Sequence, residues 1–195
     1  MTSWRLAGYS GLVALGLLAA PALASAQGFT GYFAPGNWTL TNSPGGVGGS
    51  FVFNDPDLTV IGGNVSVAGF TFFTITAPDD GEVSFNWGYT STDSDDWDQA
   101  GYVINGTPFF LAQNDSQVPF HDGLEIFNVN AGDEFGFYVE TVDGAFGAGN
   151  FGVNNFTFTA APIPEPTSLA LLGFVAAGGA AGWLRRKNKL PRRRS

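Results

Sequence analysis

The sequence contains no cysteine. A disulfide framework and a thiolate metal site are therefore both excluded. Methionine is almost absent too, since it occurs once, as the first residue, whereas Gly occurs 28 times and Phe 19 times. Aromatic residues suit pleated strands, so this composition favours β-structure with many glycine turns over a helical bundle.

Cationic side chains are missing from the whole middle of the chain. Residues 27–161 contain no Lys or Arg, and they hold every one of the 17 Asp and Glu residues except Glu165. A domain without cations has nothing to offer phosphate groups, so we expect no nucleic-acid partner. Its carboxylates also have no internal salt-bridge partners. They must be solvated, hydrogen-bonded or neutralised by metal ions.

The first 26 residues have the features of a secretory signal peptide. Arg5 gives a positive start, residues 6–20 form an apolar stretch predicted to be helical, and Pro21 ends it. Ala24 and Ala26 give the small-x-small pattern that signal peptidase accepts. We therefore expect export through the Sec route and cleavage after Ala26, which leaves Gln27 first. A permanent N-terminal anchor is the alternative.

Residues 162–195 form a tail with three parts in a fixed order. Pro164, Glu165 and Pro166 are extended, because proline fixes its own φ and disfavours helix in the residue before it. Residues 168–184 are uncharged and apolar, and as a helix they would span about 25 Å of a membrane. Residues 185–195 are basic and would stay in the cytoplasm, which places the acidic domain outside.

The order of these parts resembles the PEP-CTERM sorting signal of Gram-negative bacteria. The matching residues are Pro164, Glu165 and Pro166, then the short hydrophobic segment, then Arg185 and Arg186. The resemblance implies a transient stay in the inner membrane and recognition by exosortase, a membrane-embedded cysteine peptidase that cleaves near the motif. It also implies a bacterium that makes exopolysaccharide and a biofilm matrix. The basic segment here runs on to Ser195, and a plain C-terminal anchor is the alternative.

Residues 27–161 alternate between apolar and polar side chains with the period of a β-strand. The alternation is clearest over 82–89, 135–139 and 155–159, and the Asn105-Gly106 pair predicts a hairpin between two further strands. The run 70–76 also predicts a strand, with an ambiguous facing at Phe72 and Phe73. Short strands with frequent turns predict an all-β domain, a β-sandwich or jelly roll, between the signal helix and the transmembrane helix.

Residues 92–98 place four carboxylates within one short loop. Calcium prefers such oxygen-rich loops, although this one lacks the pattern of an EF-hand. An Asp before Gly-Tyr-Val and a later Asp before a glycine-spaced Phe strand resemble calcium-binding CUB-like jelly rolls. This resemblance implies Asp98 and Asp143 as metal ligands, with Glu82 or Asp93 as a third. A solvated acidic loop without metal is the alternative.

Three classes of function are compatible with these features. The first is a non-enzymatic cell-surface or matrix protein associated with exopolysaccharide. The second is a carbohydrate-binding module, possible with or without calcium, in which an exposed tryptophan stacks on sugar rings; Trp97 is the best candidate, ahead of Trp38 and Trp87. The third is a secreted glycoside hydrolase, which needs two carboxylates about 5–10 Å apart in a cleft. His121 has no catalytic motif around it, so we expect a histidine in a surface loop.

Overall fold

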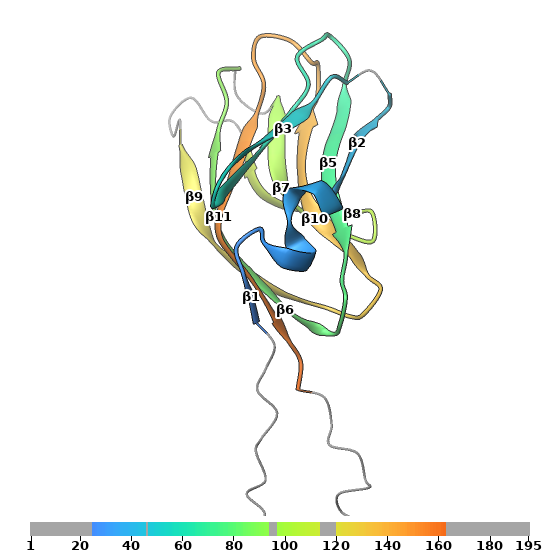
Figure 1. Cartoon of the computed structure of the whole chain (residues 1–195). Coiled ribbons are helices and arrows are strands. Elements are labelled where there is room, and N and C mark those ends of the chain that lie inside the picture. Colours follow the sequence, from blue (N-terminus) through green and yellow to red (C-terminus); the bar gives the residue numbers. More distant parts are fainter. Residues whose placement is uncertain (1–24, 46, 94–96, 114–119, 163–195) are drawn as a thin grey trace, which may run out of the picture.

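The computed structural model describes residues 25–45, 47–93, 97–113 and 120–162. These residues form two antiparallel β-sheets that pack face to face, which confirms the predicted β-sandwich (Figure 1). The two predicted terminal helices lie outside the described residues. Within the described ranges, no helix is long and apolar enough to span a membrane.

The larger sheet has six strands. Its central strand β11 pairs with β6 along most of its length, and on its other side it pairs first with β4 and then with β1. An irregularity between Asn154 and Thr157 marks the change of partner. The strands of this sheet are β1 (Ser25–Gln27), β3 (Ser50–Asn54), β4 (Asp57–Ile61), β6 (Gly81–Thr90), β9 (His121–Val129) and β11 (Asn150–Ala160).

The smaller sheet has five strands in the order β2-β5-β10-β7-β8. Two short 3-10 helices, η1 (Gly31–Phe33) and η2 (Pro35–Asn37), carry the chain from β1 in the larger sheet to β2 in this one (Figure 1). The strands of this sheet are β2 (Thr39–Ser43), β5 (Gly69–Thr76), β7 (Asp98–Ile104), β8 (Thr107–Gln113) and β10 (Glu134–Thr141).

The strands lie where the alternating pattern predicts them. Strands β6, β10 and β11 contain the three alternating segments, and the hairpin of β7 and β8 turns at Asn105-Gly106. Both turn residues have positive φ, 50° and 76°, as a type I′ turn requires. The ambiguous facing in β5 is resolved, because Phe73 is buried in the core while Phe72 packs against Phe70 and Tyr138 on the outer face.

Aromatic side chains fill the space between the sheets. Trp38 stacks on Phe73 and Phe137, with ring centroids 5.2 and 5.6 Å apart, and its Nε1–H donates to the carbonyl oxygen of Phe33. The segment before β2 thus closes one part of the core. The largest fully buried side chains include Tyr89, Phe33, Phe73, Phe85, Phe135, Phe137, Phe151 and Phe156.

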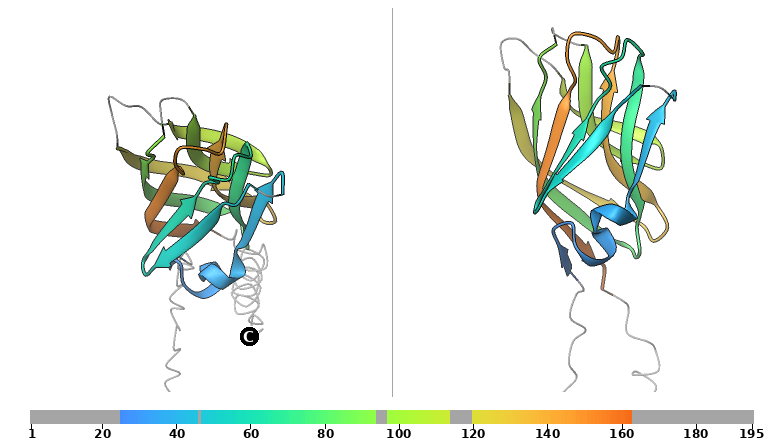
Figure 2. Two further views of the ribbon diagram at one scale, coloured as in Figure 1. Left: turned by 90° about the horizontal axis from the view of Figure 1, so that it is seen from above. Right: turned by 45° about the horizontal axis from the view of Figure 1, so that its top comes forward.

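Both ends of the described chain leave the sandwich at the same end. Ser25 of β1 pairs with Thr159 near the end of β11, so these two segments lie side by side. The loop from β10 to β11 lies at the opposite end (Figure 2). β1 begins two residues before the boundary predicted at Gln27, and Ala26 packs against the core.

Candidate functional site

Three of the four predicted metal ligands meet at one end of the sandwich. Asp98 is the first residue of β7 and pairs with Thr141 of β10, while Asp93 and Asp143 lie in the loops that follow β6 and β10. The negative charges of Asp93 and Asp143 both act on the Asp98 carboxyl, so the three groups lie in the same region of the domain. We call Asp93, Asp98 and Asp143 the acidic end.

Asp98 is the most deeply placed member of the acidic end. Its side chain is 0% exposed. The Ser91 hydroxyl donates to Asp98 Oδ2 at 2.9 Å, whereas Oδ1 is buried and has no hydrogen-bond partner. The hydroxyl oxygen of Tyr89 is also buried and without a partner. A buried polar atom without a hydrogen bond lowers the stability of the fold, so its presence calls for an explanation such as a bound ligand.

Burial raises the pKa of the Asp98 carboxyl above its usual range. The Ser91 and Thr141 hydroxyls act in the opposite direction, and the nearby charges of Asp93 and Asp143 raise the pKa further. Burial also raises the pKa of Tyr89, with Asp98 adding to the effect. Burial is the largest cause of both shifts, and no Lys or Arg of residues 27–161 is available to oppose it.

The loop after β10 is tightly folded around the acidic end. The N–H of Ala145 donates to Asp143 Oδ1 at 2.8 Å, and the N–H of Gly144 donates to the Thr141 hydroxyl at 3.0 Å. A side chain at Gly149 would come within 2.8 Å of the Tyr89 hydroxyl. Even so, no group of three or more His, Cys, Asp or Glu in the described parts of the chain is arranged to hold a metal ion. The calcium site stays a prediction.

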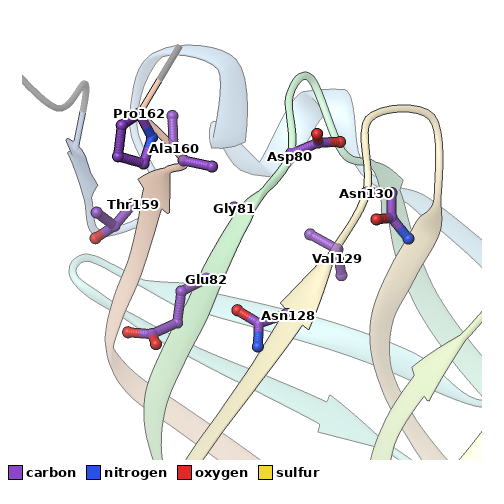
Figure 3. A pocket seen from close by; sticks show the side chains of 10 residues that line it. Asp80, Gly81, Glu82, Asn128, Val129, Asn130, Thr159, Ala160 and Pro162 are labelled. Carbon is purple, nitrogen blue, oxygen red and sulfur yellow. The ribbon is translucent and has the colours of Figure 1, made fainter. Parts of the chain in front are cut away.

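Glu82 does not belong to the acidic end. It lies at the start of β6, about 26 Å of extended strand from Thr90. There it lines a shallow pocket of about 410 Å³, beside Asn128 of β9 and Thr159 of β11 (Figure 3). Of the two alternatives for the third ligand, the structure therefore brings Asp93, and not Glu82, to Asp98 and Asp143.

The three tryptophans proposed for sugar stacking have different environments. Trp38 is buried in the core, so the suggestion that it lies on the surface is wrong. Trp87 stacks on Phe151 at 6.0 Å and packs against the core. Trp97 is 41% exposed and directly precedes β7, and its carbonyl oxygen accepts a hydrogen bond from the N–H of Val142. Of the three, Trp97 is the most exposed, while Trp87 is half-buried and lines a depression on the larger sheet.

His121 is not in a surface loop, contrary to the prediction. It is the first residue of β9 and pairs with Tyr89 of β6. Its side chain is half-buried, and Nε2 has no hydrogen-bond partner.

A further feature escaped the sequence analysis. On the outer face of the larger sheet, Gly88 of β6 and Gly152 of β11 pair directly, and they leave a depression between longer side chains. The ring of Phe120 lies against Gly88. A Cβ atom added at Gly88 would come within 3.0 Å of this ring. Both glycines are visible in the sequence at positions that face outward from two strands. The sequence alone does not reveal that these two strands pair and bring the glycines together.

Comparison with known proteins gives one family match. Residues 162–187 match the family described as PEP-CTERM protein-sorting motif. No curated protein sequence matches the chain.

Among solved structures, three carbohydrate-binding proteins resemble the sandwich weakly. A family 35 carbohydrate-binding module from Clostridium thermocellum is 16% identical, with a TM-score of 0.31, over 73% of this chain and 100% of that one. A GH26-CBM35 β-(1,4)-mannanase from Podospora anserina is 16% identical, with a TM-score of 0.30, over 66% of this chain and 26% of that one. A CBM4 structure is 9% identical, with a TM-score of 0.31, over 70% of this chain and 95% of that one.

These TM-scores are too low to carry an argument about function, and the family match covers the sorting motif alone. By that match, the chain carries a PEP-CTERM protein-sorting motif, which implies an exported protein that exosortase processes.

Proposed function

We propose that this chain is a non-catalytic protein of the cell surface or extracellular matrix, where its β-sandwich associates with exopolysaccharide. The observation that carries the proposal is the position of the sorting motif. The motif begins at residue 162, directly after β11 ends at Ala160. A folded domain thus precedes the sorting signal without a long linker.

The arrangement of the ends supports this role. β1 and the end of β11 lie side by side, so the signal peptide and the sorting tail attach at the same end of the domain. While the tail is held in the membrane, the acidic end therefore points away from it. Signal peptidase cleavage after Ala26 leaves Gln27, which pairs with Thr157, as the one remaining residue of β1.

The charge of the domain fits an exterior location. Residues 27–161 carry acidic side chains and no Lys or Arg. Strong net charge of one sign keeps a protein soluble and separate from its copies. It also disfavours binding to nucleic acid and to anionic lipid surfaces.

The hydrolase alternative has less support than the binding role. The pocket shown in Figure 3 is lined by two carboxylates, Asp80 and Glu82, but their side chains extend in different directions. Asp80 accepts a hydrogen bond from the N–H of Ala131 at 2.7 Å, which ties its carboxylate to a turn. Paired catalytic carboxylates must instead face one substrate from two sides.

The sorting proposal is tested by replacing Pro164, Glu165 and Pro166 together with alanine in the producing bacterium. We expect the variant to accumulate in the inner membrane as an uncleaved precursor, while the native chain appears outside in a shortened form. Fractionation followed by mass spectrometry of the intact chain measures both. Thr167→Ser is the matched control, and normal processing of the triple variant contradicts the proposal.

We also propose that a calcium ion binds at the acidic end. Asp98 supports this, because its buried carboxylate has an unpaired oxygen and no cationic partner. Calcium binds through carboxylate, hydroxyl and carbonyl oxygens together, so Asp93 and Asp143 would be joined by backbone oxygens of the two loops. A melting temperature that is the same with calcium and with a chelator removes the proposal.

A further inference from the structure

The outer face of the larger sheet holds a groove that runs across four strands. Two depressions, of about 310 and about 550 Å³, are lined by residues of β9, β6, β11 and β4. They meet where Gly88, Phe120 and Asn154 line both of them. Three spacings between strands give a length of about 14 Å. We call this feature the outer groove.

Two glycines form the floor of the outer groove. Gly88 and Gly152 are paired neighbours, and Gly152 also pairs with Thr59 of β4. A Cβ atom added at Gly152 would meet only the carbonyl oxygen of Gly88, at 3.6 Å. The space above Gly152 is therefore open, and a ligand can approach the backbone closely there.

Neutral polar side chains stand on both sides of this floor. Asn86 pairs with Asn154 on one side, and Thr90 pairs with Asn150 on the other. Amides and hydroxyls both donate and accept hydrogen bonds, as sugar hydroxyls do. Phe120 lies over one end of the floor and is 54% exposed, so its ring offers an apolar face.

The charge of the outer groove restricts the class of ligand. Among the described residues that line it, Asp57 and Asp122 are the only ionisable side chains, and both are acidic. The described residues contain no Lys or Arg that could balance an anionic ligand. Like charges repel, so uronic acids, sulfated sugars and phosphates are disfavoured.

We propose that the outer groove binds a neutral, linear polysaccharide, with one sugar ring over Gly152 and another against the exposed face of Phe120, whose ring covers Gly88. The inference rests on the proposed association with exopolysaccharide and names its site and its ligand class. It also moves the sugar contact away from Trp97, which lies outside the groove.

The first test is affinity electrophoresis of the full chain in a detergent without a sugar headgroup. The probes are β-1,4-glucan, mannan and dextran as neutral polymers, and alginate as an anionic one. We expect at least one neutral polymer to retard the protein and alginate to have no effect. Phe120→Ala should weaken the binding about tenfold, which corresponds to the loss of one aromatic contact.

A matched control is available on the other sheet. Phe110 is 53% exposed, nearly the same as Phe120, but it belongs to β8. Phe110→Ala should leave binding unchanged. Trp97→Ala separates the two candidate sites, because a loss of binding in this variant but not in Phe120→Ala overturns the outer groove.

A second variant separates binding from folding. Gly152→Val places a β-branched side chain on the open floor, where its backbone conformation and surroundings allow it. We expect an unchanged or higher melting temperature together with at least tenfold weaker binding. A Gly152→Val protein that binds like the native chain overturns the proposal, as does failure of all three neutral polymers or tighter binding of alginate. Failure of export or processing in the producing cell, in contrast, bears on the proposed function alone.

Discussion

At the scale of single residues, Asp98 is a buried carboxylate in a domain that has no cationic side chain to pair with it. Its neighbours Tyr89, Asp93 and Asp143 are all neutral or negative, and its raised pKa means that folding favours its protonated form. The stability that Asp98 contributes is therefore complete below the ordinary aspartate pKa of about 3.9. It is lost as the pH rises through the higher pKa of the folded state.

The loss of stability with rising pH gives a prediction for the metal-free protein. In a chelator at pH 7, Asp98→Asn should raise the melting temperature by a few degrees, because the neutral amide removes the buried charge. At about pH 4 the native chain and the variant should melt alike. Calcium at pH 7 should raise the melting temperature of the native chain and not that of the variant. Scanning calorimetry measures all three, and a lower melting temperature of Asp98→Asn in chelator contradicts the assignment.

The sequence predicts which residues are close when they are near in the chain. It does not predict which side chains are buried when the burial depends on distant strands. The closeness of Asp93 to Asp98 follows from their position in one loop, and the role of Asp143 came from a resemblance. Trp38 was named among the surface tryptophans that could stack on sugar rings, but it is buried. Its burial depends on Phe73 and Phe137, which come from two other strands, so no local pattern could reveal it.

At the scale of elements, the β7–β8 hairpin depends on its two turn residues. A Cβ atom at Gly106 would meet nothing within 4 Å, but the residue has φ of 76°. Gly106→Ala should therefore cost about 1–2 kcal/mol of unfolding free energy through backbone conformation alone. Urea unfolding measures this value.

Gly36, in η2, is the matched control for this substitution. A Cβ atom there also meets nothing within 4 Å, and its φ lies outside the left-handed region. Gly36→Ala should leave the stability unchanged or raise it by up to about 1 kcal/mol, because alanine restricts the unfolded chain. Equal effects of the two substitutions would show that φ is not the cause.

The strands were predictable as elements, but their partners were not. Period-two alternation located β6, β10 and β11, and turn chemistry located the β7–β8 hairpin. The order of strands depends on pairings between distant segments, such as β11 with β4 and β6. Glu82 was grouped with Asp98 only through the resemblance to CUB-like jelly rolls, and it lies at the other end of β6.

At the scale of the whole molecule, the separation of charge along the chain is its most consequential property. All cations lie in residues 1–26 and 185–195, whereas the sandwich is purely anionic. The sequence was sufficient to predict this, because charge is additive and needs no structure. The outer groove was not predictable, since it exists only where two glycines from distant segments become neighbours.

The uniform sign of the charge leads to a prediction about salt. Repulsion among carboxylates weakens the folded state most when screening is weakest, with a Debye length of about 30 Å at 0.01 M and about 3 Å at 1 M salt. The melting temperature in chelator at pH 7 should therefore rise by several degrees as sodium chloride increases over this range. Choline chloride should act like sodium chloride, because screening depends on ionic strength and not on the identity of the cation. A flat response would mean that solvent already screens the carboxylates, whereas a rise with sodium alone would indicate cation binding in place of general repulsion. At pH 4, where many of these carboxylates are protonated, the effect should shrink.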